Sequence, residues 1–77
     1  MPRAMPQIVV EPRPDGRWAR QKNGSQRAAS LHDTQSAAEA AARTQARRER
    51  AELVVKGRDG SIQRRDSFGA DRRDRPG

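Results

Sequence analysis

The feature that most constrains the fold is an alanine-rich stretch without glycine or proline, residues 35–50. Seven of the fifteen residues from Ala37 to Ala51 are alanine, which has the highest helix propensity of all residues. We therefore expect one helix here, with Asp33 or Thr34 as its N-cap. On a helical wheel one stripe is formed by Ala38, Ala41, Ala42 and Ala46. Such small side chains let a helix lie close to a sheet, although they bury little apolar area.

Short runs of β-branched and other apolar residues flank this helix, and turn signals separate them. Strands are expected at residues 8–11, 17–22 and 26–31 before the helix, and at 52–56 and 61–65 after it. Pro14-Asp15-Gly16 and Asn23-Gly24 are typical of tight turns between strands. The sequence therefore predicts an α+β fold of order β-β-β-α-β-β, with a mainly antiparallel sheet and one Ala-rich helix packed on one face.

The composition favours a disordered chain, whereas the arrangement of the apolar residues favours a folded one. Leu, Ile, Val and Phe make up only nine of the 77 residues, and such a low content with a high net charge is typical of disordered chains. The grouping of these residues into runs favours a folded core. The expected core comprises Ile8, Val10, Trp18, Leu31, Ala38, Ala42, Leu53, Val55, Ile62 and Phe68. We expect a flexible N-terminal tail at 1–7, one small domain at 8–69 and a disordered charged tail at 70–77.

Several classes of function lack the residues that they need. The chain has no cysteine and one histidine, His32, so we expect no metal site, no cofactor and no disulfide. His32 and Asp33 are neighbours that point apart on an extended chain, so neither is expected to be catalytic, and we expect no enzyme. No apolar run approaches the roughly 18 residues of a membrane span. No signal peptide is evident, so a cytoplasmic protein without a membrane partner is expected.

Four separate segments of the chain match the sequence pattern of a known family, in the same order. They are Arg13-Pro14-Asp15-Gly16-x-Trp18, Thr34 opening the Ala-rich helix, Ala51-Glu52-Leu53-Val54-Val55-x-Gly57-x-Asp59-Gly60-x-Ile62, and Asp66-Ser67-x-Gly69. Together they resemble the small bacterial proteins of domain-of-unknown-function family 2188, over roughly residues 8–69. The resemblance implies a short β/α domain without an assigned activity. The chain departs from that family's usual pattern at Ala37, where an acidic residue is common, and after Gly69.

A second, local resemblance covers residues 15–46. Gly16-x-Trp18, the basic strand after it and the Ala-rich helix are similar to the three-stranded-sheet-plus-helix domain of tyrosine recombinases. In that family the sheet face lies in the DNA major groove. The resemblance implies that Arg20, Lys22 and Arg27 face the groove.

The charge points to nucleic acid. The net charge is +7 and the isoelectric point is about 11.6, which is the electrostatic footprint of a nucleic-acid-binding domain. The only aromatic residues, Trp18 and Phe68, are expected in the core, so base stacking is disfavoured. We therefore predict low-specificity, salt-sensitive binding, to duplex DNA rather than RNA. The candidate contacts are Arg20, Lys22, Arg27, Arg43, Arg47, Arg50, Lys56, Arg58, Arg64 and Arg65.

A different class of function stays open. An edge strand of the expected sheet can pair with another chain, as in a protein partner or a homodimer. In that case the basic residues form a solvated surface and serve only solubility.

Overall fold

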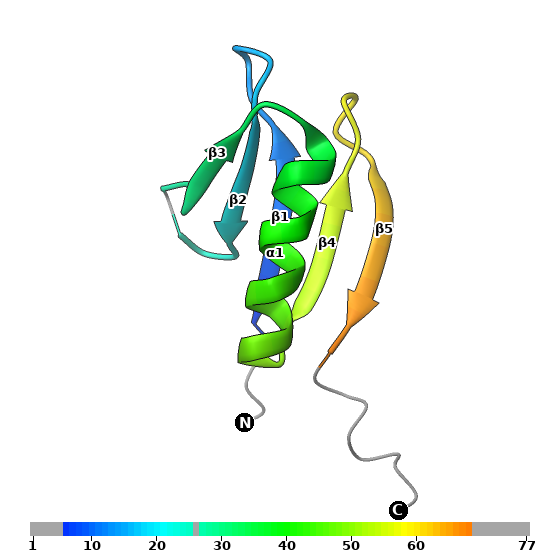
Figure 1. Cartoon of the computed structure of the whole chain (residues 1–77). Helices are drawn as coiled ribbons and strands as arrows, with labels where there is room; N and C mark the ends of the chain where they lie inside the picture. Colours follow the sequence, from blue (N-terminus) through cyan, green and yellow to red (C-terminus); the bar gives the residue numbers. More distant parts are fainter. Residues whose placement is uncertain (1–5, 26, 69–77) are drawn as a thin grey trace, which may run out of the picture.

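The computed structural model describes residues 6–25 and 27–68. Its elements are β1 (Gln7–Pro12), β2 (Trp18–Lys22), β3 (Ser30–His32), α1 (Gln35–Glu49), β4 (Glu52–Lys56) and β5 (Ile62–Ser67). The five strands form one sheet of order β3-β2-β1-β4-β5 (Figure 1). The α+β fold and the predicted order β-β-β-α-β-β are confirmed.

The sheet is antiparallel except at its centre. β1 pairs with β2, β2 with β3 and β4 with β5 in antiparallel fashion, whereas β1 and β4 are parallel. The parallel pair arises because α1 carries the chain back along the sheet before β4 begins, so β4 runs in the direction of β1. The helix packs on β1, β2, β3 and β4 and leaves the opposite face of the sheet open.

Capping residues define both ends of α1. Thr34 is the N-cap, and its Oγ1 accepts a hydrogen bond of 3.1 Å from the backbone N–H of Ala37. The C-cap is Arg50, which adopts the left-handed conformation (φ 57°) and donates its N–H to the carbonyl of Ala46. Ala38, Ala42 and Ala46 of the predicted stripe are buried, and Ala41 is half-buried. No helix within the described ranges has the length and apolar composition needed to cross a membrane.

The core lies between α1 and the sheet. Its fully buried large side chains are Ile8, Val10, Leu53 and Val55, with Trp18 close behind at 5% exposure. Phe68 is half-buried and packs against this cluster.

The prediction is wrong for two core residues, Leu31 and Ile62. Their side chains are 41% and 49% exposed, respectively. Leu31 is opposite Ala19, on the face of the sheet turned away from α1. At β5 an irregularity between Val55 and Lys56 shifts the register, so that Ile62 pairs with Lys56 and shares its face. Side chains of paired residues point the same way, and the shift therefore carries Ile62 away from the helix.

The predicted boundaries differ at a few places. The third strand comprises only residues 30–32 rather than 26–31, and Gln26 lies outside the described residues. Of the tail expected at 1–7, Gln7 is instead the first residue of β1. Residues 1–5 and the tail expected at 70–77 lie outside the described ranges.

Candidate nucleic-acid interface

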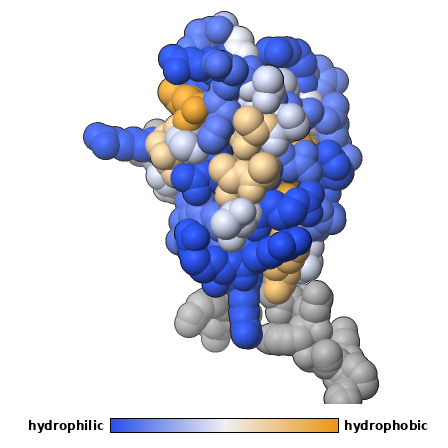
Figure 2. Space-filling model, in the orientation of Figure 1, coloured by the Kyte–Doolittle hydropathy of each residue, from blue (hydrophilic) through white to orange (hydrophobic). Residues whose placement is uncertain are grey.

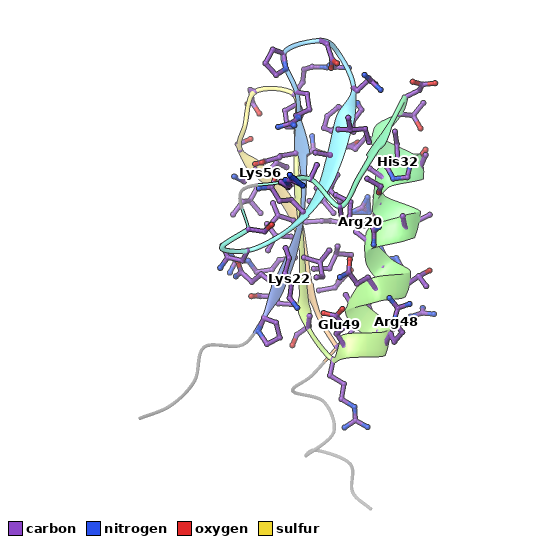
Figure 3. All side chains as sticks on the ribbon, turned by 90° about the vertical axis from the view of Figure 1, so that its left-hand side faces the viewer. Arg20, Lys22, His32, Arg48, Glu49 and Lys56 are labelled. Carbon is purple, nitrogen blue, oxygen red and sulfur yellow. The ribbon has the colours of Figure 1, made fainter. Side chains whose placement is uncertain are left out.

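The basic residues of β2 face the helix. Along this strand Trp18, Arg20 and Lys22 alternate with Ala19 and Gln21. Arg20 donates from Nη1 to Oε1 of Gln45 on α1 (2.7 Å) and from Nε to Oγ of Ser30 on β3 (3.0 Å). The Nζ of Lys22 lies 3.3 Å from an oxygen of Glu49 on α1 (Figure 3). Arg20 and Lys22 therefore lie on the covered side of the sheet, and not on the open face that the recombinase resemblance implies for groove contacts.

A second set of cations is held between α1 and β5. Glu39 accepts from Nη2 of Arg43 at 2.7 Å and from Nη2 of Arg64 at 2.8 Å. Arg43 also bonds to Asp66 at 3.3 Å. The hydrogen bond to Glu39 is the main reason that the pKa of Arg43 is raised above its ordinary value. These two arginines thus tie the outer strand β5 to the helix.

The open face of the sheet carries acidic as well as basic residues. The Nζ of Lys56 lies 3.5 Å from Glu11, and Nη1 of Arg65 lies 3.6 Å from Glu52. Glu52 also accepts a hydrogen bond of 2.9 Å from the side chain of Gln7. The open face is therefore a mixed, internally paired surface.

Six of the ten candidate contacts thus have intramolecular partners. They are Arg20, Lys22, Arg43, Lys56, Arg64 and Arg65. The other four are Arg27, Arg47, Arg50 and Arg58. Arg47 and Arg58 lie over aromatic rings, with Cζ 5.7 Å from the centroid of Phe68 and 4.8 Å from that of Trp18.

Several arginines without a carboxylate partner lie in the last turn of α1, at its C-cap and in the turn that follows β2. We call this surface the basic end and define it by the residues described within 22–27 and 46–50. It holds five cations, Lys22, Arg27, Arg47, Arg48 and Arg50, and one carboxylate, Glu49. The ion pair with Glu49 places Lys22 beside the end of the helix, and Arg27 lies farther out, in the turn that follows β2. Figure 2 shows hydrophilic residues over this lower end of the helix side.

Sequence reasoning missed Arg48. The predicted contacts on the helix were Arg43, Arg47 and Arg50, and they did not include Arg48. The signal that finds it is position, because Arg47 and Arg48 both lie in the last helical turn, where basic side chains also stabilise the helix dipole.

The opposite end of the sheet, where the β1–β2 and β4–β5 turns lie, is nearly balanced in charge. Arg13, Arg17 and Arg58 are accompanied there by Asp15 and Asp59. The pKa of Asp15 is lowered chiefly by the backbone N–H of Arg17, and that of Asp59 chiefly by the backbone N–H of Ser61. These aspartates therefore serve as local turn acceptors.

His32 closes a small polar cluster at the end of β3. Its Nε2 lies 2.7 Å from Oγ of Ser30, which also accepts from Arg20. In the part of the chain that the structure describes, no group of three or more His, Asp or Glu side chains is arranged to hold a metal ion, and no pocket is found.

Comparison with known proteins identifies a family. The family model DUF2188, described as an uncharacterized protein conserved in bacteria, matches residues 8–68. The resemblance drawn from the four sequence segments is thereby confirmed. No curated protein and no solved structure matches the chain.

Proposed function

We propose that this chain, which belongs to the bacterial family DUF2188, binds the phosphate backbone of nucleic acid, and of duplex DNA first, through its basic end. The observation that carries the proposal is the separation of charge along the domain. Among the residues that define the basic end there are five cations and one carboxylate, whereas the turn end holds three cations and two carboxylates.

Three arginines at the basic end keep their donors available. Within residues 6–25 and 27–68, Arg27, Arg48 and Arg50 form no ion pair. All three are exposed. A guanidinium presents several N–H donors in a planar fork that matches a phosphate. Each such contact releases counterions from the nucleic acid, and this release drives salt-sensitive binding.

The burial of the two aromatic rings predicts low specificity for nucleic-acid sequence. Trp18 is 5% exposed and lies beneath Arg58. Phe68 is half-buried against the core and lies beneath Arg47. Neither ring is a free platform for a base, so phosphate contacts dominate, and these carry little sequence information.

The proposal moves the interface from the sheet face to the end of the helix. On the open face Glu11 and Glu52 neutralise the neighbouring cations. On the covered side Arg20 and Lys22 bond to α1. An interaction at the free edge of the longer outer strand β5 is less favoured, because Arg64 and Arg65 lie on that strand and charged residues oppose edge pairing.

The test compares two triple variants with equal loss of charge. Arg47→Gln/Arg48→Gln/Arg50→Gln removes cations from the basic end. Arg13→Gln/Arg17→Gln/Arg58→Gln removes as many from the turn end. Binding of a fluorescein-labelled mixed-sequence duplex is followed by anisotropy over a salt series, and circular dichroism verifies that each variant is folded.

We expect the basic-end variant to lose affinity strongly and to flatten the plot of log affinity against log salt by up to about three units. The turn-end variant should keep most of the wild-type slope. Equal effects of both variants would contradict the assignment to the basic end. Absent or salt-independent binding of the wild type would contradict the proposed function itself.

A further inference from the structure

The open face of the sheet has a regular pattern at its centre. Along β1 it presents Gln7, Val9 and Glu11, and beside them on β4 it presents Glu52, Val54 and Lys56. A hydrogen bond of 2.9 Å joins Gln7 to Glu52, and an ion pair of 3.5 Å joins Glu11 to Lys56. Between them Val9 and Val54 are strand partners. Because β1 and β4 are parallel, the two rows run in the same direction.

We propose that this open face packs against the same face of a second copy of the chain. The two-fold axis runs between β1 and β4, parallel to both strands. Rotation about this axis places the β1 row of each copy over the β4 row of the other. Glu11 then meets Lys56 of the second copy, and Val9 meets Val54 of the second copy. The face is thus complementary to itself in charge, while Val54 is already buried within each copy at 3% exposure.

The same arrangement accounts for two exposed apolar residues. Among the described residues, Leu31 and Ile62 are the only large hydrophobic side chains classed as exposed. Leu31 lies beside Ala19 and Ile62 beside Lys56 on the open face, at opposite edges of the sheet. The rotation brings Ile62 over Ala19, which is itself fully buried, and next to Leu31 of the second copy, so the two exposed side chains become neighbours.

The size of the face predicts a weak dimer. In this arrangement four of the five strands overlap, β1 with β4 and β2 with β5. At about 4.8 Å spacing, with about five residues at 3.3 Å each, they cover about 320 Å² per copy. The total of about 640 Å² is well below the roughly 1,200 Å² of stable complexes, so association is weak, reversible and concentration-dependent. The helices lie on the outside, and both basic ends point in the same direction.

A charge-swap experiment tests the proposal without nucleic acid. Glu11→Lys leaves a lysine opposite each Lys56, and Lys56→Glu leaves a glutamate opposite each Glu11. Each variant loses the ion pair within its own chain, and each should be monomeric. When the two are mixed, lysines of one face glutamates of the other, so a heterodimer should form. Sedimentation velocity from about 10 µM to about 1 mM measures the association.

Controls separate this interface from others. Lys22→Glu and Glu49→Lys break an ion pair on the covered side, and each should dimerise as the wild type does. Leu31→Lys/Ile62→Lys changes only exposed side chains, so it should keep the fold and lose the dimer. A wild type that stays monomeric at the highest concentration overturns the proposal. So does a wild-type dimer that persists in both charge-swap variants, because its interface then lies elsewhere.

Discussion

The Nζ of Lys22 lies 3.3 Å from Oε1 of Glu49, which joins the last residue of β2 to the last residue of α1. Glu49 also accepts a 3.0 Å hydrogen bond from Gln45. That hydrogen bond is the first cause, and Lys22 a further one, of the lowered pKa of Glu49. The carboxylate is therefore ionised at neutral pH, and it sits among the arginines of the basic end.

Removing this charge should strengthen nucleic-acid binding. In Glu49→Gln a negative charge that repels phosphate is lost, and Lys22 is released from its ion pair. We expect the affinity for a duplex to rise about three- to tenfold and the salt slope to steepen by up to about one unit, as measured by anisotropy. Asp33→Asn, which removes one negative charge outside the basic end, is the control. A similar gain in both variants would show that only net charge matters.

Glycine at position 50 should stabilise the protein while weakening binding. Arg50 holds a left-handed backbone (φ 57°), which costs a residue with a Cβ about 1 kcal/mol, whereas glycine adopts it freely. We expect Arg50→Gly to raise the melting temperature by about 4–8 °C. In contrast, Arg48→Gly lies inside the helix and should destabilise the fold by about 1 kcal/mol. Melting curves by circular dichroism show whether each substitution raises or lowers the melting temperature.

The close approach of helix and sheet predicts intolerance of larger side chains in the alanine stripe. Ala42 is fully buried, so Ala42→Leu forces α1 away from the sheet and should cost about 1–3 kcal/mol. Ala40 is exposed, and Ala40→Leu should change the free energy of unfolding by less than about 0.5 kcal/mol. Urea denaturation of both variants provides the comparison. Equal costs would mean that the stripe does not set the packing distance.

Acid should destabilise the fold through the two turn aspartates. The pKa values of Asp15 and Asp59 are lowered in the fold from an ordinary value of 3.8. Unfolding therefore takes up protons in this range, and stability rises with pH. The contribution of these two carboxylates to the free energy of unfolding is fully present above about pH 4 to 5. It is lost as the pH falls through their pKa values in the folded state.

The measurement is the urea midpoint from about pH 2 to about pH 7. Asp15→Asn/Asp59→Asn should flatten the dependence and match the wild type most closely at the acid end. An unchanged pH profile in the double variant would mean that other carboxylates control acid unfolding, and Glu49, whose pKa is also lowered, is then the next to replace.

Much of the fold follows from chemistry that acts over a few residues. The alanine stretch, the cap at Thr34 and the turn at Pro14-Asp15-Gly16 each act locally, so the order of strands and helix is readable along the chain. Period-two alternation also places Trp18 and Arg20 on one face of β2. These features determine the element order and most of the core by themselves.

Only the tertiary structure decided how the charges are used. Arg20 and Lys22 look like a free basic row in the sequence, yet their partners on α1, Gln45 and Glu49, are more than twenty residues away. The register shift at Val55/Lys56 turns Ile62 outward. Ion pairs across elements and a one-residue shift in strand pairing depend on the packed arrangement of distant segments. Local sequence patterns cannot contain them, and the basic end therefore emerges only when the helix is placed on its sheet.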